Sequence, residues 1–338
     1  MVRSVRLSFF STLALSLVSL LSFASAAEVR LAETPALSPD GSRLVFSWRG
    51  DLWVVASTGG RARQLTFHPS IDRQPRFSPD GRRLAFVSDR TGSNQIHLMP
   101  AGGGEAQQLT FHTEGYALLD WYPDGEQLLV QAQRDHFWRH ADRFYRIGTR
   151  PRSAETLLFD AAAEAGSLAR DGKRIAFVRE GTQWWRQGYR GSQAAQLWLF
   201  DPSADPASGA PYVPLVQEEA AARDPLWIGD QSLLYVSERS GVFQLWRREL
   251  ADGSDHQLTE FETGVIWEPT VSADGKVAVF RQGFDLWRLD LTDASAAPQR
   301  LRIVVRDDAA QDPIVRRVLS EATDAAFTDD ALEIALVA

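Results

Sequence analysis

Short apolar runs separated by polar turns recur along the chain, and the stretch Phe77–Arg90 shows the pattern most clearly. Pro79 sets φ for the second position of a tight turn, and the side chain of Asp80 can bond the backbone of that turn. Gly81 adopts the left-handed conformation that a short hairpin loop needs. The apolar run Leu84–Val87 that follows is typical of a strand buried on both faces. The stretch therefore predicts a strand, a turn and a second strand.

The same turn recurs, with aspartates at positions 40, 80, 124, 171, 230 and 274, and a degenerate further copy lies at Phe327–Asp330. Each turn is followed by an apolar strand, a third strand built around a pair such as Leu52-Trp53, and a short fourth strand such as Gln64-Leu65-Thr66. Four short strands per unit of roughly 40 to 45 residues are typical of a propeller blade. We therefore predict an all-β fold, a six-bladed β-propeller of four-stranded antiparallel blades with an incomplete extra blade at the C-terminus.

The repeats also predict the domain boundaries. The six blades occupy residues 28–306, a charged segment at 307–321 is expected to be a linker, and residues 322–338 supply two strands of the incomplete blade. Two interpretations remain open for this last segment: a second propeller starts there and the sequence is truncated, or it completes a seven-bladed ring with Glu28–Glu33. We expect the six-bladed ring to close by packing blade six on blade one without an exchanged strand, which would make this seam its weakest part.

The N-terminal segment at positions 1–26 has the pattern of a cleaved bacterial signal peptide. Arg3 and Arg6 precede an apolar run from Leu7 to Phe23, and Ala24-Ser25-Ala26 supplies a cleavage site of small residues. An uncleaved membrane anchor is the alternative, but the serines within the run and the small-residue site favour cleavage. We therefore expect a periplasmic or secreted protein that is not attached to a membrane after cleavage.

Charge and cysteine content exclude several classes of function. Removing Arg3 and Arg6 takes the formal net charge from −8 to −10, so the mature chain is a poor ligand for nucleic acid. The sequence contains no cysteine, which excludes disulfides, a thiol nucleophile and thiolate metal sites. Export without disulfides is consistent with a large core folding in the bacterial periplasm.

The fourth blade carries an insertion, because the turn aspartates at positions 171 and 230 are further apart than any other consecutive pair. Within it lie five side chains suited to peptide contacts, through apolar surface, stacking and carboxylate pairing: Trp184, Trp185, Arg186, Tyr189 and Arg190. These are the candidate substrate-contact residues. In the alternative interpretation, which is equally supported, both tryptophans fold back and cap the blade.

The sequence offers little for catalysis or metal binding. His136 and His140, with Asp135 or Asp142, could bind zinc if they shared a helix face, but a loop between strands is unsuited to that helix. No G-x-S-x-G nucleophile elbow is present. We therefore expect no catalytic residue, no metal site and no cofactor in this chain.

Beyond the repeat, the segments Gly50–Val55, Phe77–Arg90 and Leu119–Gly125 resemble the N-terminal propeller of tricorn-type peptidases. The most specific match is Arg179–Ser192 with its Trp-Trp-Arg motif, and Gly283–Arg288 supports it. The resemblance extends from about Glu28 to the C-terminus. It implies a six-bladed propeller that precedes a seven-bladed one, a PDZ-like domain and a serine-peptidase domain, and it places every catalytic residue beyond residue 338.

This resemblance implies that the propeller gates or guides peptide or protein substrates, or helps to assemble a large homo-oligomeric serine peptidase, without chemistry of its own. Two alternatives remain. The first is a stand-alone periplasmic scaffold of the Tol-system type that binds partner proteins, although the α/β domain that usually precedes that propeller is not seen before blade one. The second is the N-terminal propeller of a prolyl-oligopeptidase-type hydrolase.

Overall fold

The computed structural model describes residues 26–134, 142–179, 186–204, 211–216, 219–306, 324–327 and 334–337. Residues Ala27–Val305 form one compact unit. Strands β28 (Asp324–Phe327) and β29 (Ile334–Val337) belong to another unit, in which they pair with each other as an antiparallel hairpin. The predicted signal peptide, linker and degenerate turn lie outside the described residues, apart from Ala26 and Phe327 at their edges.

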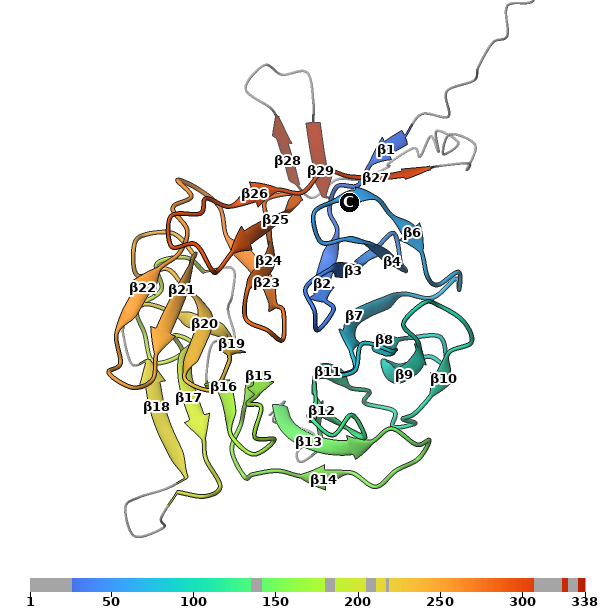
Figure 1. Cartoon of the computed structure of the whole chain (residues 1–338), viewed down its shortest axis with the longest axis horizontal. Coiled ribbons are helices and arrows are strands. Elements are labelled where there is room, and N and C mark those ends of the chain that lie inside the picture. The colour runs from blue at the N-terminus through green and yellow to red at the C-terminus, as the bar shows by residue number, and fades with distance from the viewer. Residues whose placement is uncertain are drawn as a thin grey trace, which may run out of the picture. The chain divides into compact units, whose positions relative to one another are not determined.

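Within its described residues, the Ala27–Val305 unit contains six four-stranded antiparallel sheets arranged around a centre (Figure 1). In each sheet, strands that follow one another in the sequence are neighbours, so each sheet corresponds to one sequence repeat. The first three sheets comprise β2 (Glu33–Leu37), β3 (Arg43–Trp48), β4 (Asp51–Ala56) and β6 (Arg63–Gln64); β7 (Asp72–Phe77), β8 (Arg83–Ser88), β9 (Gln95–Pro100) and β10 (Gln107–Gln108); and β11 (Ala117–Trp121), β12 (Gln127–Gln133), β13 (Asp142–Gly148) and β14 (Thr156–Leu157).

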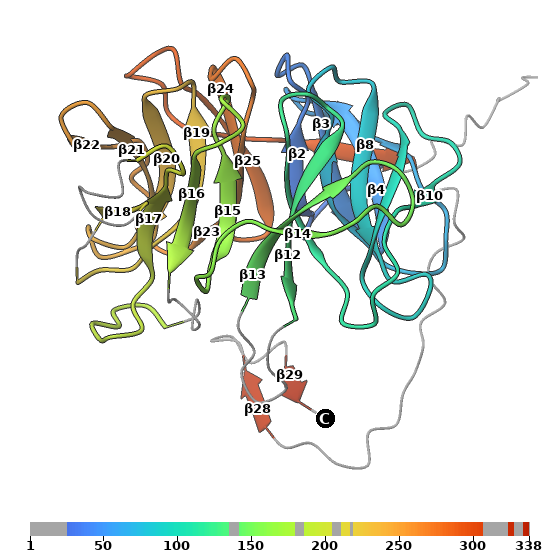
Figure 2. The same cartoon turned by 90° about the horizontal axis from the view of Figure 1, so that it is seen from below.

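The remaining three sheets have the same order. They comprise β15 (Glu164–Leu168), β16 (Ile175–Arg179), β17 (Gln196–Phe200) and β18 (Tyr212–Val216); β19 (Ala222–Ile228), β20 (Ser232–Ser237), β21 (Gln244–Glu249) and β22 (Asp255–Gln257); and β23 (Ile266–Val271), β24 (Val277–Gln282), β25 (Asp285–Asp290) and β26 (Gln299–Arg300). In the turned view of Figure 2, strands of these sheets stand side by side and run between two faces where the loops gather. The predicted all-β propeller fold is confirmed, and no helix occurs among the described residues.

The turn that defines the repeat is braced by its own aspartate. In the first copy, the Gly41 amide donates to the Ser38 carbonyl at 2.8 Å, and Gly41 has φ of 68°, which a residue with a side chain rarely adopts. The carboxylate of Asp40 accepts hydrogen bonds from the hydroxyls of Ser38 and Ser42 and from the amide of Ser42. The bonds from Ser38 and then Ser42 lower the pKa of Asp40 to about 2, so the ionised carboxylate holds the turn.

The second strand of each sheet forms the buried layer of its blade. Five of the six second strands carry a large buried ring at the equivalent position: Phe46, Phe86, Phe177, Tyr235 and Phe280. Each sheet has two apolar faces, and the clusters of buried side chains join residues of neighbouring sheets. Burial of these faces against one another is what drives the repeats to form a ring.

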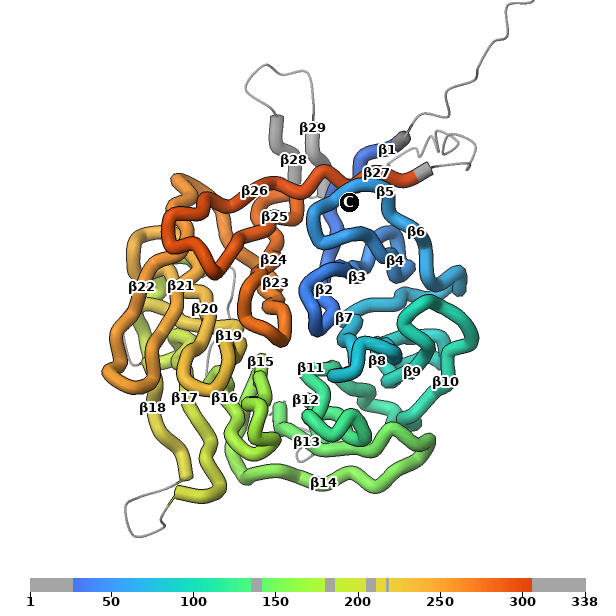
Figure 3. Tube along the Cα trace, viewed as in Figure 1, coloured from blue at the N-terminus to red at the C-terminus, as the bar shows by residue number. Residues whose placement is uncertain are grey.

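The ends of the ring are joined by a separate three-stranded sheet of β1 (Ala26–Glu28), β27 (Ile303–Arg306) and β5 (Gly60–Arg61). Strand β27 runs parallel to β5, and the carbonyl of Ile303 accepts a hydrogen bond of 2.9 Å from the amide of Val29. Figure 3 shows the C-terminal end of this unit crossing the N-terminal segment. Blade six packs on blade one as expected, and neither four-stranded sheet takes a strand from the other end of the ring. The expectation that no strand joins the two ends is wrong, because β27, which follows blade six, bonds to both β1 and β5.

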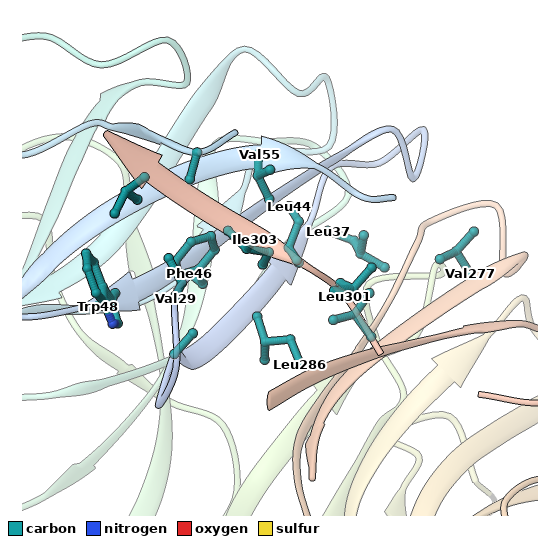
Figure 4. Packing of buried hydrophobic residues seen from close by; sticks show 14 residues of the cluster. Val29, Leu37, Leu44, Phe46, Trp48, Val55, Val277, Leu286, Leu301 and Ile303 are labelled. Atoms are coloured by element: carbon teal, nitrogen blue, oxygen red, sulfur yellow. The ribbon is translucent and has the colours of Figure 1, made fainter. Parts of the chain in front are cut away.

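Close backbone approach makes this joining sheet possible. A Cβ atom on Gly59 would lie 2.8 Å from the carbonyl oxygen of Arg302, so only glycine fits beside the last strand. The side chains of β27 enter the core of the first blade, as Figure 4 shows for Ile303 among Val29 and Phe46. The N-terminal strand β1 pairs with β27. Both interpretations of residues 322–338 stay predictions.

Candidate functional site

A cavity of about 580 Å³ lies among the first strands of the six sheets, and residues of all six line it. Figure 1 shows these strands, β2, β7, β11, β15, β19 and β23, around the centre of the ring. We call this space the axial cavity. Because one strand from every repeat bounds it, the charge and shape of the axial cavity are set by residues far apart in the sequence.

Each first strand contains a bulge beside the axial cavity, seen as a shift in its pairing register with the second strand. In five of the six, a residue other than glycine at the bulge has φ between 45° and 52°. These residues are Thr34, Gln74, Ala165, Asp224 and Glu268. A left-handed backbone at such residues costs about 1 kcal/mol or more each, so its repetition here requires a compensating interaction.

Hydrogen bonds between adjacent blades provide that compensation at Thr34, Gln74 and Ala165. The amide of Thr34 donates to the carboxylate of Glu268 at 2.9 Å, and the amide of Gln74 donates to the hydroxyl of Thr34 at 3.0 Å. The amide of Leu118 then donates to the side-chain oxygen of Gln74 at 3.1 Å. The bulge turns each amide toward the preceding blade, whose side chain accepts from it. A series of hydrogen bonds thus runs around the cavity from blade six to blade three.

The series continues to blade four in a different way and then stops. Leu118 has no acceptor in its side chain, and Gln131 of the second strand accepts from the amide of Ala165 instead, at 3.3 Å. Ala165 has no acceptor for the next blade. Within the described residues, no hydrogen bond continues the series through Asp224, whose carboxylate has an ion-pair contact of 3.6 Å with Arg223. Asp224 is therefore the least engaged acid of the cavity wall.

The charged groups of the cavity wall are held in a poorly solvated environment. Burial raises the pKa of Asp120, Asp224 and Glu268, and burial lowers the pKa of Arg76. Amides of Leu168 and Trp121 donate to Asp120 and oppose this rise. Among these buried groups the three acids outnumber the one base, Arg76, so this part of the cavity wall favours a cationic ligand group.

The structure describes three of the five predicted contact residues, and these three do not line the axial cavity. Trp184 and Trp185 lie outside the described residues. The guanidinium of Arg186 stacks over the ring of Tyr189 at 4.5 Å from its centroid, and both side chains lie on the connection between β16 and β17. Arg190 forms an ion pair of 2.6 Å with Glu238 of blade five. Their role as substrate contacts stays a prediction.

Glu238 of blade five anchors the connection between β16 and β17. Only 1% of the residue is exposed, and its carboxylate accepts from the Gly188 amide and from Arg190, both at 2.6 Å. Gln187 adds a bond of 2.6 Å to the carbonyl of Gly241. Three hydrogen bonds thus fix the end of the blade-four insertion to the loop between β20 and β21. Arg190 has a structural role, whatever else it binds.

Exposed apolar side chains gather on the loops of one face. Loops between second and third strands, and those leading into a first strand, emerge on the face opposite the aspartate turns. We call this the insertion face, and the other the Asp-turn face. Five exposed large apolar side chains occupy loops of the insertion face: Leu31, Phe67, Ile71, Phe111 and Phe284. Phe67 and Phe284 are 76% and 61% exposed, which leaves apolar surface available for contact with another molecule.

The described residues hold no group of three or more His, Asp or Glu side chains suited to a metal ion. Of the zinc candidates, His136, His140 and Asp135 lie outside those residues. In the part of the chain that the structure describes, no helix is long and apolar enough to cross a bilayer.

Sequence reasoning missed the cavity wall, although a signal for it was present. In four repeats a proline immediately follows the residue with positive φ. These prolines are Pro35, Pro75, Pro225 and Pro269, and each lies four residues before the second residue of its aspartate turn. That periodic proline marks the bulge in four of the six repeats. It could have identified the wall residues that precede it.

Comparison with known proteins agrees with this geometry. The family model described as "Tricorn protease N-terminal beta propeller domain" matches residues 29–295. A curated relative, "Tricorn protease homolog 1" of Streptomyces coelicolor, is 28% identical over 271 residues, covering 78% of this chain and 24% of the relative. The chain therefore spans about a quarter of the length of that relative.

Two solved structures share the fold. The tricorn protease structure superposes with a TM-score of 0.62 at 18% identity, covering 88% of this chain and 28% of that one. TolB from Acinetobacter baumannii superposes with a TM-score of 0.54 at 18% identity, covering 71% of this chain and 56% of TolB. Because the family model covers well over half of the sequence, the chain belongs to the family of tricorn protease N-terminal β-propeller domains.

Proposed function

We propose that this propeller guides peptides through or into its axial cavity as the gating module of an exported, tricorn-like serine peptidase. The observation that carries the proposal is the axial cavity itself, whose wall combines one strand from every blade with charged groups that burial leaves poorly solvated. A packed core needs neither a cavity of this size nor ionisable groups facing it. The chemistry would belong to other parts of a longer protein.

The apolar side chains of the insertion face support the same role. Unfolded peptides expose apolar side chains, and Phe67, Phe111 and Phe284 provide surface that can contact them. The predicted contact residues Arg186 and Tyr189 lie on a loop of this face. We propose that peptides reach the axial cavity from this side.

The proposal extends to location and assembly. We propose that the N-terminal segment at positions 1–26 directs export to the periplasm or medium and is then removed, and that copies of the longer protein assemble into an oligomer. A stand-alone scaffold that binds partner proteins is the alternative that the TolB-like fold favours.

Binding and turnover measurements on the purified chain test the proposal. Calorimetric titration with a set of unstructured peptides should show saturable binding, and mass spectrometry after prolonged incubation should recover every peptide intact. An unrelated folded protein of similar size and charge serves as the control and should not bind. Hydrolysis by this chain, or the absence of saturable binding to any peptide, would contradict the proposal.

A further inference from the structure

Six equivalent residues form the mouth of the axial cavity on the Asp-turn face. They are the second residues of the six aspartate turns, and all of them line the cavity: Pro39, Pro79, Pro123, Arg170, Gly229 and Ala273. Five of these side chains carry neither a charge nor a hydrogen-bond donor. Arg170 is the exception, and the structure of the turn does not explain it, because the copies in blades one, two, three and six close the same amide-to-carbonyl hydrogen bond without a cation.

The side chain of Arg170 extends from one turn to another across this mouth. Its Nη2 donates a hydrogen bond to the carbonyl oxygen of Ala273, which belongs to the turn of blade six. The intervening blade has Gly229 at the equivalent position, so no side chain stands between them there. Arg170 is exposed, and its long side chain is free to leave this position at little cost.

The partner of Arg170 is a neutral group, although carboxylates are close along the chain. Asp171 is paired with Arg174 at 2.6 Å, and Asp274 is paired with Lys276 at 3.0 Å. Hydrogen bonds between a guanidinium and a carboxylate are roughly twice as strong as bonds between neutral groups, and they can be bidentate. A carboxylate that reached this mouth would therefore displace the Ala273 carbonyl.

The charges deeper in the cavity determine which way such a ligand lies. Asp120, Asp224 and Glu268 line the cavity together with one buried base, Arg76, so the acids outnumber the base and the balance of charge disfavours a carboxylate there. An ammonium group would be attracted, most strongly to Asp224, which is the least engaged of the three. The cavity therefore has a cation at one mouth and acids at its middle, a distribution that matches the two ends of a free peptide.

The distance between these charges indicates the length of the peptide. Glu268 and Ala273 are five residues apart along one blade, which sets an upper limit of roughly 16 Å at about 3.3 Å per residue, since the strand bulges at Glu268 and ends at Val271. An extended peptide of about five residues spans the same length.

We propose that Arg170 binds the C-terminal carboxylate of a short peptide in the axial cavity, with the amino end of the peptide directed toward Asp224. The proposal rests on the proposed function and adds to it the class of ligand, a free peptide acid of about five residues, and its orientation. It makes Arg170 a specificity-determining residue of the Asp-turn mouth.

Calorimetric titration of the full chain with the pentapeptide Ala-Ala-Phe-Ala-Ala and with its C-terminal amide tests the inference. We expect the free acid to bind about tenfold more tightly than the amide. Arg170→Gln should reduce this preference to less than twofold, and Arg170→Lys should retain part of it. Lys173→Gln, which removes an exposed cation from the same turn outside the cavity lining, is the matched control and should leave the preference unchanged.

A second titration tests the proposed orientation of the peptide in the axial cavity. Acetylating the amino end of the pentapeptide should weaken binding several-fold in the natural chain, and Asp224→Asn should remove that difference while leaving the preference for the free acid. A difference that survives Asp224→Asn would refute the proposed orientation.

The outcomes separate the inference from the function on which it rests. If neither peptide binds the natural chain, the proposed function fails and this inference fails with it. If both bind equally well, or if the preference for the acid survives Arg170→Gln, the chain still binds peptides and the role of Arg170 is refuted. The comparison of acid and amide on the natural chain needs no variant, so a folding defect cannot obscure the result.

Discussion

Ile303→Ala is expected to lower the free energy of unfolding by about 2–4 kcal/mol. Ile303 is 2% exposed and belongs to a cluster of buried side chains that includes Val29, Leu44 and Phe46 of the first blade and Val279 of the sixth. Shortening it leaves a cavity at the place where the two ends of the ring meet. The measurement is equilibrium denaturation followed by the fluorescence of the tryptophans, of which the chain has eleven.

Arg302→Ala is the matched control for this prediction, because Arg302 is the exposed residue that immediately precedes Ile303. It should change stability by less than about 0.5 kcal/mol. Amide exchange adds a second test, since the amides of Val29, Gly60 and Ala62 donate to carbonyls at positions 302–304. Equal effects of the two substitutions, or rapid exchange of these amides in the natural chain, would show that the last strand does not hold the ring closed.

Glu238→Ala is expected to lower stability by about 2 kcal/mol and to release the blade-four insertion from blade five. The substitution removes the buried acceptor of the Gly188 amide and of the Arg190 guanidinium. Arg190 is partly exposed and can find water, which keeps the cost below that of a fully buried pair. Denaturation gives the stability, and limited trypsin digestion, with cleavage after Arg186 and Arg190, reports on the insertion.

An exposed acid on the same face, Glu262, supplies the control for this second prediction. Glu262→Ala should leave both stability and the rate of trypsin cleavage at the natural level. If Glu238→Ala cleaved no faster than the natural chain, the insertion would have to be held by contacts other than these hydrogen bonds.

The repeat predicted the sheets well, because each blade is a local structure. The turn needs a proline or small residue, an aspartate and a glycine in sequence, and the following strand needs a continuous apolar run. Those features lie close together in the sequence, as at Phe77–Arg90, and the structure places the end of β7 and the whole of β8 there.

The closing sheet could not be predicted in the same way. Strands β1 and β5 are three and two residues long, which is too short to show a period. Their partner β27 (Ile303–Arg306) lies at the opposite end of the propeller sequence, and the signal for its approach to β5 is a single glycine, Gly59. Long-range pairing of such short segments leaves no local pattern, so the seam was expected to lack a shared strand.

The candidate site illustrates a related difficulty. Aromatic and cationic residues concentrated in one insertion are conspicuous in a sequence, and they drew the prediction to Arg186, Tyr189 and Arg190. The cavity wall instead takes one or more residues from each blade, such as Gln74 and Glu268, which look ordinary in isolation. A departure from the repeat was informative at Arg170, which replaces the proline found in the first three turns.

The central claim is that peptides occupy the axial cavity, and the absence of cysteine allows a direct measurement of it. Thr270→Cys places one thiol in the cavity wall, and Ser295→Cys places one on an exposed turn of the same blade. The rate at which a small thiol reagent modifies each variant is measured with and without a saturating pentapeptide. The account predicts that the peptide slows modification at position 270 at least tenfold and leaves position 295 unchanged. Unchanged modification at position 270, with the peptide shown to be bound, would place the binding site elsewhere and contradict the claim.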